Sequence, residues 1–144
     1  MMRENMGFYH GKRRDTGEWV EGYLAGYNLI CMEEPQEVRH ATGEYYDQIA
    51  YVGFVEVDPD TVGQFTGLLD KNGKRIFEGD ILERHVQGDI LVNRGVVNWD
   101  ARNGRWAHQL NTMNPCFYMH NPEAFEVIGN IHDNPELLKV TPDE

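Results

Sequence analysis

The feature that most constrains this chain is the shortness of its apolar runs. Val, Ile, Phe, Tyr and Trp gather in brief segments that Gly, Asn, Asp or Pro interrupts every few residues. Short runs of β-branched and aromatic residues between turn-forming residues are typical of β-strands. A length of 144 residues suits one domain that buries its own core. We therefore expect a mostly β fold (β or α+β).

The first half of the chain is expected to be β-rich but irregular. Residues 18–24 and 28–32 alternate as strands do, and Gly26 lies in the tight turn between them, so they predict a hairpin. Residues 33–47 have a polar composition without a period and predict an exposed loop. Residues 48–57 again resemble a strand, which should end at Pro59 because proline cannot donate to a ladder.

The segment Asp70-Lys71-Asn72-Gly73-Lys74 looks at first like the start of a calcium loop. The later ligand and glycine positions of an EF-hand do not follow it. Asn-Gly readily adopts the positive φ angles of a tight turn. We therefore expect a hairpin turn between arms at residues 68–69 and 75–77.

The second half predicts a more regular series of strands, at residues 80–84, 95–99, 105–110 and 125–131. Strands of this number and length, joined by short turns, suit a small barrel, with an SH3-like barrel as the first choice. Asn134 and Pro135 suit the start of a brief C-terminal helical turn, whose Leu137 and Leu138 should pack onto the barrel. We expect an irregular β-rich part at 1–75 and the barrel at 76–144, together forming one compact unit.

Three segments resemble the YopX-like family of phage and prophage proteins, in the family's order and approximate spacing. They are Gly11-Lys12-Arg13 with Gly17 to Tyr23, Val57 to Ile81, and Glu126 to Leu138. The sequence departs from the family at His10, where an arginine usually precedes the Gly-Lys pair. The resemblance implies a phage or prophage origin, an irregular N-terminal part and an SH3-like C-terminal barrel. It brings no established activity and no catalytic residues.

The acidic composition argues against a nucleic-acid-binding protein. The chain has 24 acidic and 13 basic residues and a net charge of −11, whereas phosphate binding needs clustered Lys and Arg. The densest basic cluster is Lys12-Arg13-Arg14, and the charges of Asp15 and Glu18 follow it, which predicts a solvated turn. An acidic surface suits basic protein partners instead.

The two cysteines and the hydropathy pattern indicate an ordinary cytoplasmic protein of the host cell. Cys31 and Cys116 form no CxxC pair, so we expect reduced, buried thiols. Residues 1–12 lack the apolar core of a signal peptide, and no stretch approaches the length of a membrane span.

Three groups of residues are candidates for catalysis or metal binding, and for each the structural interpretation is favoured. They are the carboxylates Glu78 and Asp80, the pair Cys116 and His120, and the histidines His85, His108, His120 and His132. The two carboxylates have no companion nucleophile nearby, and the Cys–His pair has no identifiable third residue to orient it. The histidines lack the spacing of standard metal ligands. We therefore assign no catalytic, cofactor-binding or metal-binding residue, and we do not expect an enzyme.

Four aromatic residues are the candidates for binding a partner: Trp99, Trp106, Phe117 and Tyr118. Exposed aromatics on a small barrel supply rigid contact area, although core packing competes as an explanation for both tryptophans. The stretch 111–122 predicts a loop. The favoured hypothesis is a noncatalytic protein-binding or regulatory module. The alternatives are a nucleic-acid-associated protein and an enzyme with an unrecognised site, and self-association through open strand edges also remains open.

Overall fold

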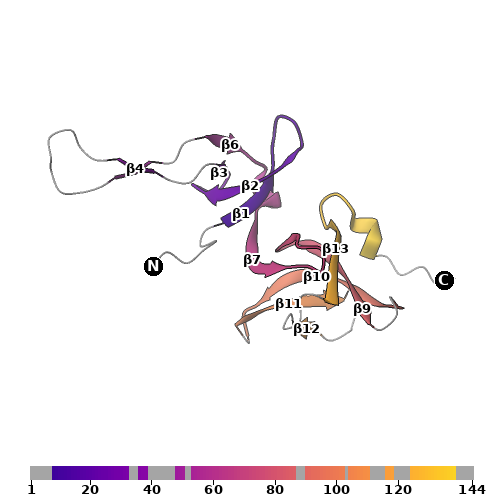
Figure 1. Cartoon of the computed structure of the whole chain (residues 1–144). Coiled ribbons are helices and arrows are strands. Elements are labelled where there is room, and N and C mark those ends of the chain that lie inside the picture. Colours follow the sequence, from indigo (N-terminus) through magenta and orange to yellow (C-terminus); the bar gives the residue numbers. More distant parts are fainter. Residues whose placement is uncertain are drawn as a thin grey trace. The chain divides into compact units, whose positions relative to one another are not determined.

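The computed structural model describes residues 8–32, 36–38, 48–50, 53–86, 90–102, 104–110, 116–118 and 124–138. The chain divides into two compact units, Met1–Gln64 and Phe65–Glu144. Strands dominate both units and the described helical segments are short 3-10 turns, so the mostly β fold class is confirmed (Figure 1). The expected parts 1–75 and 76–144, and their union in one compact unit, stay predictions.

The first unit contains an antiparallel sheet in the order β6-β3-β2-β1-β7, in which β7 continues to β8 (Arg75–Phe77) as the sixth strand. Its members are β1 (Phe8–Lys12), β2 (Trp19–Leu24), β3 (Leu29–Cys31), β6 (Phe54–Glu56) and the start of β7 (Gly63–Leu69). The sheet curls, because Arg13 after β1 forms a bridge with Val57 after β6. The Asp58 N–H donates to the Lys12 carbonyl at 2.8 Å beside that bridge. The predicted hairpin of β2 and β3 is confirmed, with Tyr23 opposite Cys31.

The core of the first unit depends on two glycines. Ile30, Cys31 and Val57 are completely buried. A Cβ on Gly11 would lie 3.0 Å from the Val57 side chain, and a Cβ on Gly22 would overlap the carbonyl oxygen of Cys31. The strands can therefore approach this closely only because both positions lack a side chain.

β6 ends at Glu56, before Pro59, as expected, and the 3-10 turn η1 (Pro59–Thr61) follows it. The Asp58 carboxylate caps this turn by accepting from the Asp60 N–H at 3.0 Å. The Thr61 hydroxyl is buried, donates to the Asp58 carbonyl at 2.6 Å and accepts from the Lys12 N–H at 2.9 Å. The turn is thereby attached to β1.

The expectation of a loop throughout residues 33–47 was wrong at one point. β4 (Gln36–Val38) lies inside this segment and pairs with β5 (Gln48–Ala50) as a two-stranded antiparallel sheet. A strand of three residues needs no periodic pattern of its own, because the pairing partner supplies its backbone hydrogen bonds. The expectation of one strand over residues 48–57 was also wrong, because β5 and β6 are separate strands that pair with different partners.

The second unit contains a five-stranded sheet in the order β12-β11-β10-β9-β13 that curls into a half-barrel (Figure 1). The strands are β9 (Asp80–Val86), β10 (Ile90–Asp100), β11 (Arg105–Leu110), β12 (Cys116–Tyr118) and β13 (Phe125–Asn130). Register shifts between Leu91 and Asn93 and between Val127 and Gly129 suit the curl, since bulges bend strands. Four of these strands were predicted. β12 corrects the loop expected at 111–122.

The core of the second unit forms where the hairpin of β7 and β8 (Arg75–Phe77) meets the curled sheet. Its buried residues are Ile76, Leu82, Val97 and Phe125, against which Leu68, Trp106, Ala124 and Val127 pack. The predicted C-terminal helical turn is confirmed as η3 (Pro135–Leu138), with both leucines half-buried. None of the described helical segments has the length and hydropathy that a membrane crossing needs.

Candidate functional site

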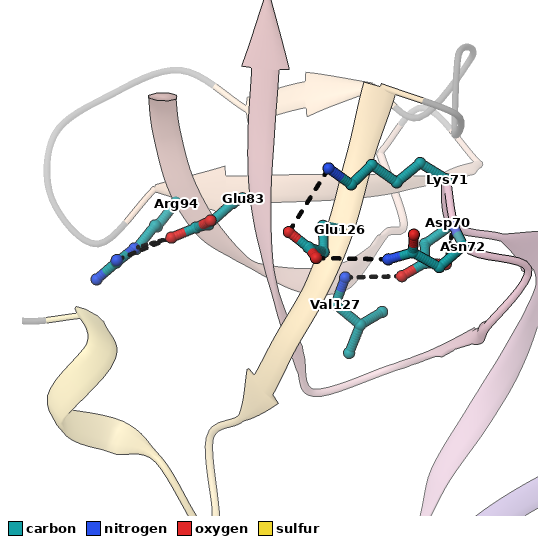
Figure 2. A network of polar contacts seen from close by, with 7 residues as sticks. All are labelled: Asp70, Lys71, Asn72, Glu83, Arg94, Glu126 and Val127. Atoms are coloured by element: carbon teal, nitrogen blue, oxygen red, sulfur yellow. Dashed lines mark hydrogen bonds and ion pairs between the residues drawn. The ribbon is translucent and has the colours of Figure 1, made fainter. Parts of the chain in front are cut away.

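The turn at Asp70–Lys74 is a folding device built around one buried carboxylate. Asp70 is only 6% exposed. Its Oδ1 accepts from the N–H groups of Asn72 at 2.8 Å and Lys74 at 2.9 Å, and its Oδ2 accepts from the Val127 N–H at 3.0 Å (Figure 2). The carboxylate therefore stabilises its own turn and also holds β13, which lies 57 residues further along the chain. The predicted hairpin turn is confirmed, with Gly73 at a φ of 80°.

Polar side chains reinforce the same junction from the exposed side. Figure 2 shows Lys71 and Asn72 reaching toward Glu126 of β13. The Lys71 Nζ lies 3.8 Å from one carboxylate oxygen of Glu126, and the Asn72 amide donates to the other at 3.4 Å. The Lys71 N–H also donates to the Phe125 carbonyl at 3.0 Å. These are long, half-exposed contacts, so we attribute most of the stabilisation at this junction to Asp70.

The carboxylates Glu78 and Asp80, the candidates for acid and base chemistry, lie at a tight turn: Glu78 is between β8 and β9, and Asp80 is the first residue of β9. Gly79 has a φ of 91°, which favours glycine. The Asp80 carboxylate is buried and accepts from the Phe77 N–H at 2.8 Å, while the Gly79 carbonyl accepts from the Ile131 N–H at 3.0 Å. These contacts are those of a turn anchored to its neighbours.

A bridge between β9 and β10 extends to the C-terminal turn. Arg94 of β10 donates through Nε to Glu83 of β9 at 2.8 Å, and its Nη2 lies 2.8 Å from the same oxygen (Figure 2). The Arg94 Nη1 also donates to the Leu137 carbonyl at 3.4 Å. The Glu83 side chain is 15% exposed. The arginine thus connects the end of η3 to the sheet.

The basic cluster Lys12-Arg13-Arg14 is electrostatically compensated within its own unit. Arg13 binds both carboxylate oxygens of Asp15 at 2.9 Å. This hydrogen bond lowers the pKa of Asp15 and raises the pKa of Arg13. Arg14 pairs with Glu56 at 3.2 Å. Both arginines have acidic partners at the surface, which suits the predicted solvated turn.

Trp99 and Trp106 meet across β10 and β11 at the end of that hairpin. The two residues are directly opposite in register, and their rings pack edge to face with centroids 5.2 Å apart. Trp106 also packs against the core, whereas 49% of Trp99 is exposed. The two tryptophans therefore differ in role: Trp106 supports the indole that Trp99 presents to solvent.

The other two candidate residues lie one strand further along the same sheet. Phe117 and Tyr118 belong to β12, where the register places Phe117 opposite His108 and Tyr118 opposite Ala107. The structure therefore places all four aromatic positions on three consecutive strands, β10, β11 and β12. It describes the side chains of only the two tryptophans.

The remaining candidates do not come together in the part of the chain that the structure describes. Cys31 is completely buried, as expected. His132 is exposed, and its backbone N–H donates to the side-chain oxygen of Asn130. The side chains of His85 and His108 and the whole of His120 lie outside the described residues, as does the side chain of Cys116. Among described residues, no group of three His, Cys, Asp or Glu could hold a metal ion.

Sequence reasoning missed Arg102, which lies in the turn that joins Trp99 to Trp106. Its N–H donates to the Asp100 carboxylate at 3.1 Å, and the residue is exposed. Among the described residues its guanidinium has no ion-pair partner. The short turn implied between the strands predicted at residues 95–99 and 105–110 was a signal that could have drawn attention to it, because polar residues in a hairpin turn lie at the surface.

The two β units and their anchored turns define a class of small, mostly β protein in which polar turn residues connect distant strands. The chain belongs to the YopX family, because the family model described as YopX protein matches residues 13–139. A solved structure described as the crystal structure of protein EF1440 from Enterococcus faecalis is similar in fold. Its TM-score is 0.52 at 24% identity, and the match covers 92% of this chain and 97% of that one. No curated protein matches.

Proposed function

We propose that this chain is a noncatalytic protein-binding or regulatory module of phage or prophage origin that acts in the host cytoplasm. The observation that carries the proposal is the exposed indole of Trp99, held edge to face on the half-buried Trp106. Tryptophans that are rigid and exposed contribute disproportionately to the binding energy of protein interfaces. The half-barrel sheet, which we infer to be part of an SH3-like barrel, presents this indole at the end of a hairpin.

The roles of the buried carboxylates support a noncatalytic module over an enzyme. Asp70 and Asp80 both accept backbone N–H groups of their own turns. A catalytic acid or base must exchange a proton with a substrate, whereas these groups hold strands together. The excess of 24 acidic over 13 basic residues supports a protein partner over a nucleic acid.

The test is affinity capture of the tagged protein from phage-infected host lysate, with and without nuclease, read by mass spectrometry. Trp99→Ala is compared with Tyr27→Ala, which removes another exposed aromatic, at 77% exposure, from the first unit. We expect a nuclease-resistant protein whose yield falls at least tenfold in Trp99→Ala, in line with a hot-spot loss of about 2 kcal/mol or more. Tyr27→Ala should capture it normally.

Three other outcomes would contradict the proposal. Material lost on nuclease treatment would favour a nucleic-acid-associated protein. Equal capture by wild type and Trp99→Ala would show that Trp99 does not contribute to binding the partner. Recovery of this chain alone, with a doubled mass in light scattering, would favour a homo-oligomer that covers its own strand edges.

A further inference from the structure

The end of the β10–β11 hairpin combines an exposed tryptophan with an excess of positive charge. Residues 98–106 contain Arg102 and Arg105 but only one acidic residue, Asp100. This gives the segment a formal charge of +1 in a chain whose net charge is −11. Both arginines and Trp99 are exposed. The local charge is therefore opposite in sign to that of the whole protein.

Arg102 stands apart from the other arginines whose side chains the structure describes. Arg13, Arg14 and Arg94 pair with carboxylates, and Arg75 lies over the Phe65 ring at 5.9 Å. Arg84 and Arg105 also take part in interactions. In a chain with so many acidic residues, a guanidinium without an ion-pair partner among the described residues is available to an external carboxylate.

The turn fixes the backbone from which Arg102 projects. Asp100 Oδ1 accepts the Arg102 N–H at 3.1 Å, and the Gly104 N–H donates to the Asp100 carbonyl at 2.8 Å. Gly104 has a φ of 65°, the left-handed conformation that closes such a turn. The cation and the indole thus project from one end of one hairpin. A ligand that binds both must order the Arg102 side chain, but the turn hydrogen bonds already hold the backbone at Arg102.

We propose that this surface, Trp99 with Arg102, binds an acidic protein segment that carries an apolar side chain. Arginine pairs with carboxylates in a bidentate geometry, and tryptophan supplies the apolar contact. A nucleic acid would also offer anions, but a run of phosphates needs clustered Lys and Arg, whereas this hairpin end carries only Arg102 and Arg105. A second copy of this chain would bring its whole net charge of −11 to the surface, whereas a short acidic segment brings only its own few carboxylates.

The inference rests on the proposed function and specifies its partner. It is tested by selecting displayed random 12-residue peptides on the immobilised full-length protein and measuring the selected peptides in solution by fluorescence anisotropy. We expect enrichment of peptides rich in Asp and Glu with at least one apolar residue. Their affinity should fall at least tenfold in Trp99→Ala and in Arg102→Glu. Replacing the peptide carboxylates by amides should weaken binding to wild type in the same way.

A charge exchange makes the assignment specific. Arg102→Glu should bind a peptide in which one Glu is changed to Lys better than it binds the parent peptide. Lys74→Glu, which makes the same charge change at an exposed position in another turn, should leave affinity within twofold of wild type. Circular dichroism and thermal unfolding of each variant ensure that lost binding is not lost folding.

The outcomes separate this inference from the function on which it rests. Selected peptides that depend on Trp99 but are neutral or basic, or that bind Arg102→Glu as well as wild type, would overturn the acidic-segment proposal alone. Binding of a single-stranded oligonucleotide that depends on Trp99 and Arg102 would replace it with a nucleic-acid ligand. Selection that enriches no peptide above the Trp99→Ala background would count against both.

Discussion

At the scale of single residues, Asp70 is the side chain on which the second unit most depends. Asp70→Ala removes the acceptor of three backbone N–H groups, including that of half-buried Val127. Unsatisfied donors cost about 1–3 kcal/mol each when buried and less when water replaces the acceptor. We expect the free energy of unfolding, measured by urea denaturation, to fall by about 2–4 kcal/mol. The loss is smaller than for three buried donors, because Asn72 and Lys74 are exposed and water can accept from their N–H groups.

Two comparisons make the Asp70 prediction specific. Asp60→Ala also removes one carboxylate but lies at an exposed position, so we expect a change below about 0.5 kcal/mol. Asp70→Asn keeps one acceptor oxygen and should fall between Asp70→Ala and wild type. A loss in Asp70→Ala no larger than that in Asp60→Ala would show that the turn and β13 associate without the carboxylate.

Gly22 illustrates a different requirement, which is space rather than backbone conformation. Its Cβ would overlap the Cys31 carbonyl oxygen and lie 3.0 Å from Ile30. Gly22→Ala must therefore move β2 away from β3, and we expect a loss of at least about 2–3 kcal/mol in thermal or urea unfolding, comparable to overpacking a core. Gly17 has a φ of 75° but only the end of Lys12 near its Cβ position. Gly17→Ala should cost about 1 kcal/mol.

If Gly22→Ala fails to fold, Gly11→Ala provides a graded measurement. Its Cβ would lie 3.0–3.2 Å from the side chains of Val57 and Ile30, which can yield slightly. Its loss should lie between those of Gly17→Ala and Gly22→Ala. The reverse order, with Gly17→Ala the most destabilised, would mean that backbone conformation outweighs close packing in this unit.

At the scale of elements, local patterns were sufficient where each segment carried its own signal. The Asn72-Gly73 turn, the β2–β3 hairpin and the four longer strands of the second half were predicted because alternation and turn residues occur within a few positions. β4 and β12 were missed, although β3 and β8 are equally short and were predicted, because residues 33–47 lack a period and Asn and Pro surround β12. Pairing with a neighbouring strand supplies the backbone hydrogen bonds of each. Their composition contributes little to that pairing.

The features that could not be predicted from the sequence depend on contacts between distant elements. The turn at Asp70 was predicted, but its bond to Val127 crosses 57 residues and leaves no local spacing to recognise. Trp99 and Trp106 were both predicted as candidate binding residues, yet their exposure differs because Trp106 lies against the core that Val97, Leu82 and Ile76 form. The two tryptophans could therefore be named from the sequence, while their different roles and the nearby Arg102 needed the structure.

At the scale of the whole molecule, one strand belongs to both compact units. Gly63 and Gln64 at the start of β7 pair with β1, and Phe65 and Leu69 pair with β8. The boundary between the units falls inside this strand, between Gln64 and Phe65. Unfolding of either unit would release its part of β7, and the unit that stays folded needs the rest of that strand. We therefore expect the two units to unfold cooperatively.

The three tryptophans make this cooperation measurable, because Trp19 lies in the first unit and the other two in the second. Trp19→Phe leaves fluorescence that reports on the second unit, and the double variant Trp99→Phe/Trp106→Phe leaves Trp19 alone. In each variant, fluorescence in urea should follow the same transition as circular dichroism, as two-state unfolding requires. Comparing probes within one variant avoids the stability change that each substitution causes. A fluorescence midpoint that departs from the circular dichroism midpoint in either variant would show that β7 frays at its middle and that each unit is stable without the other.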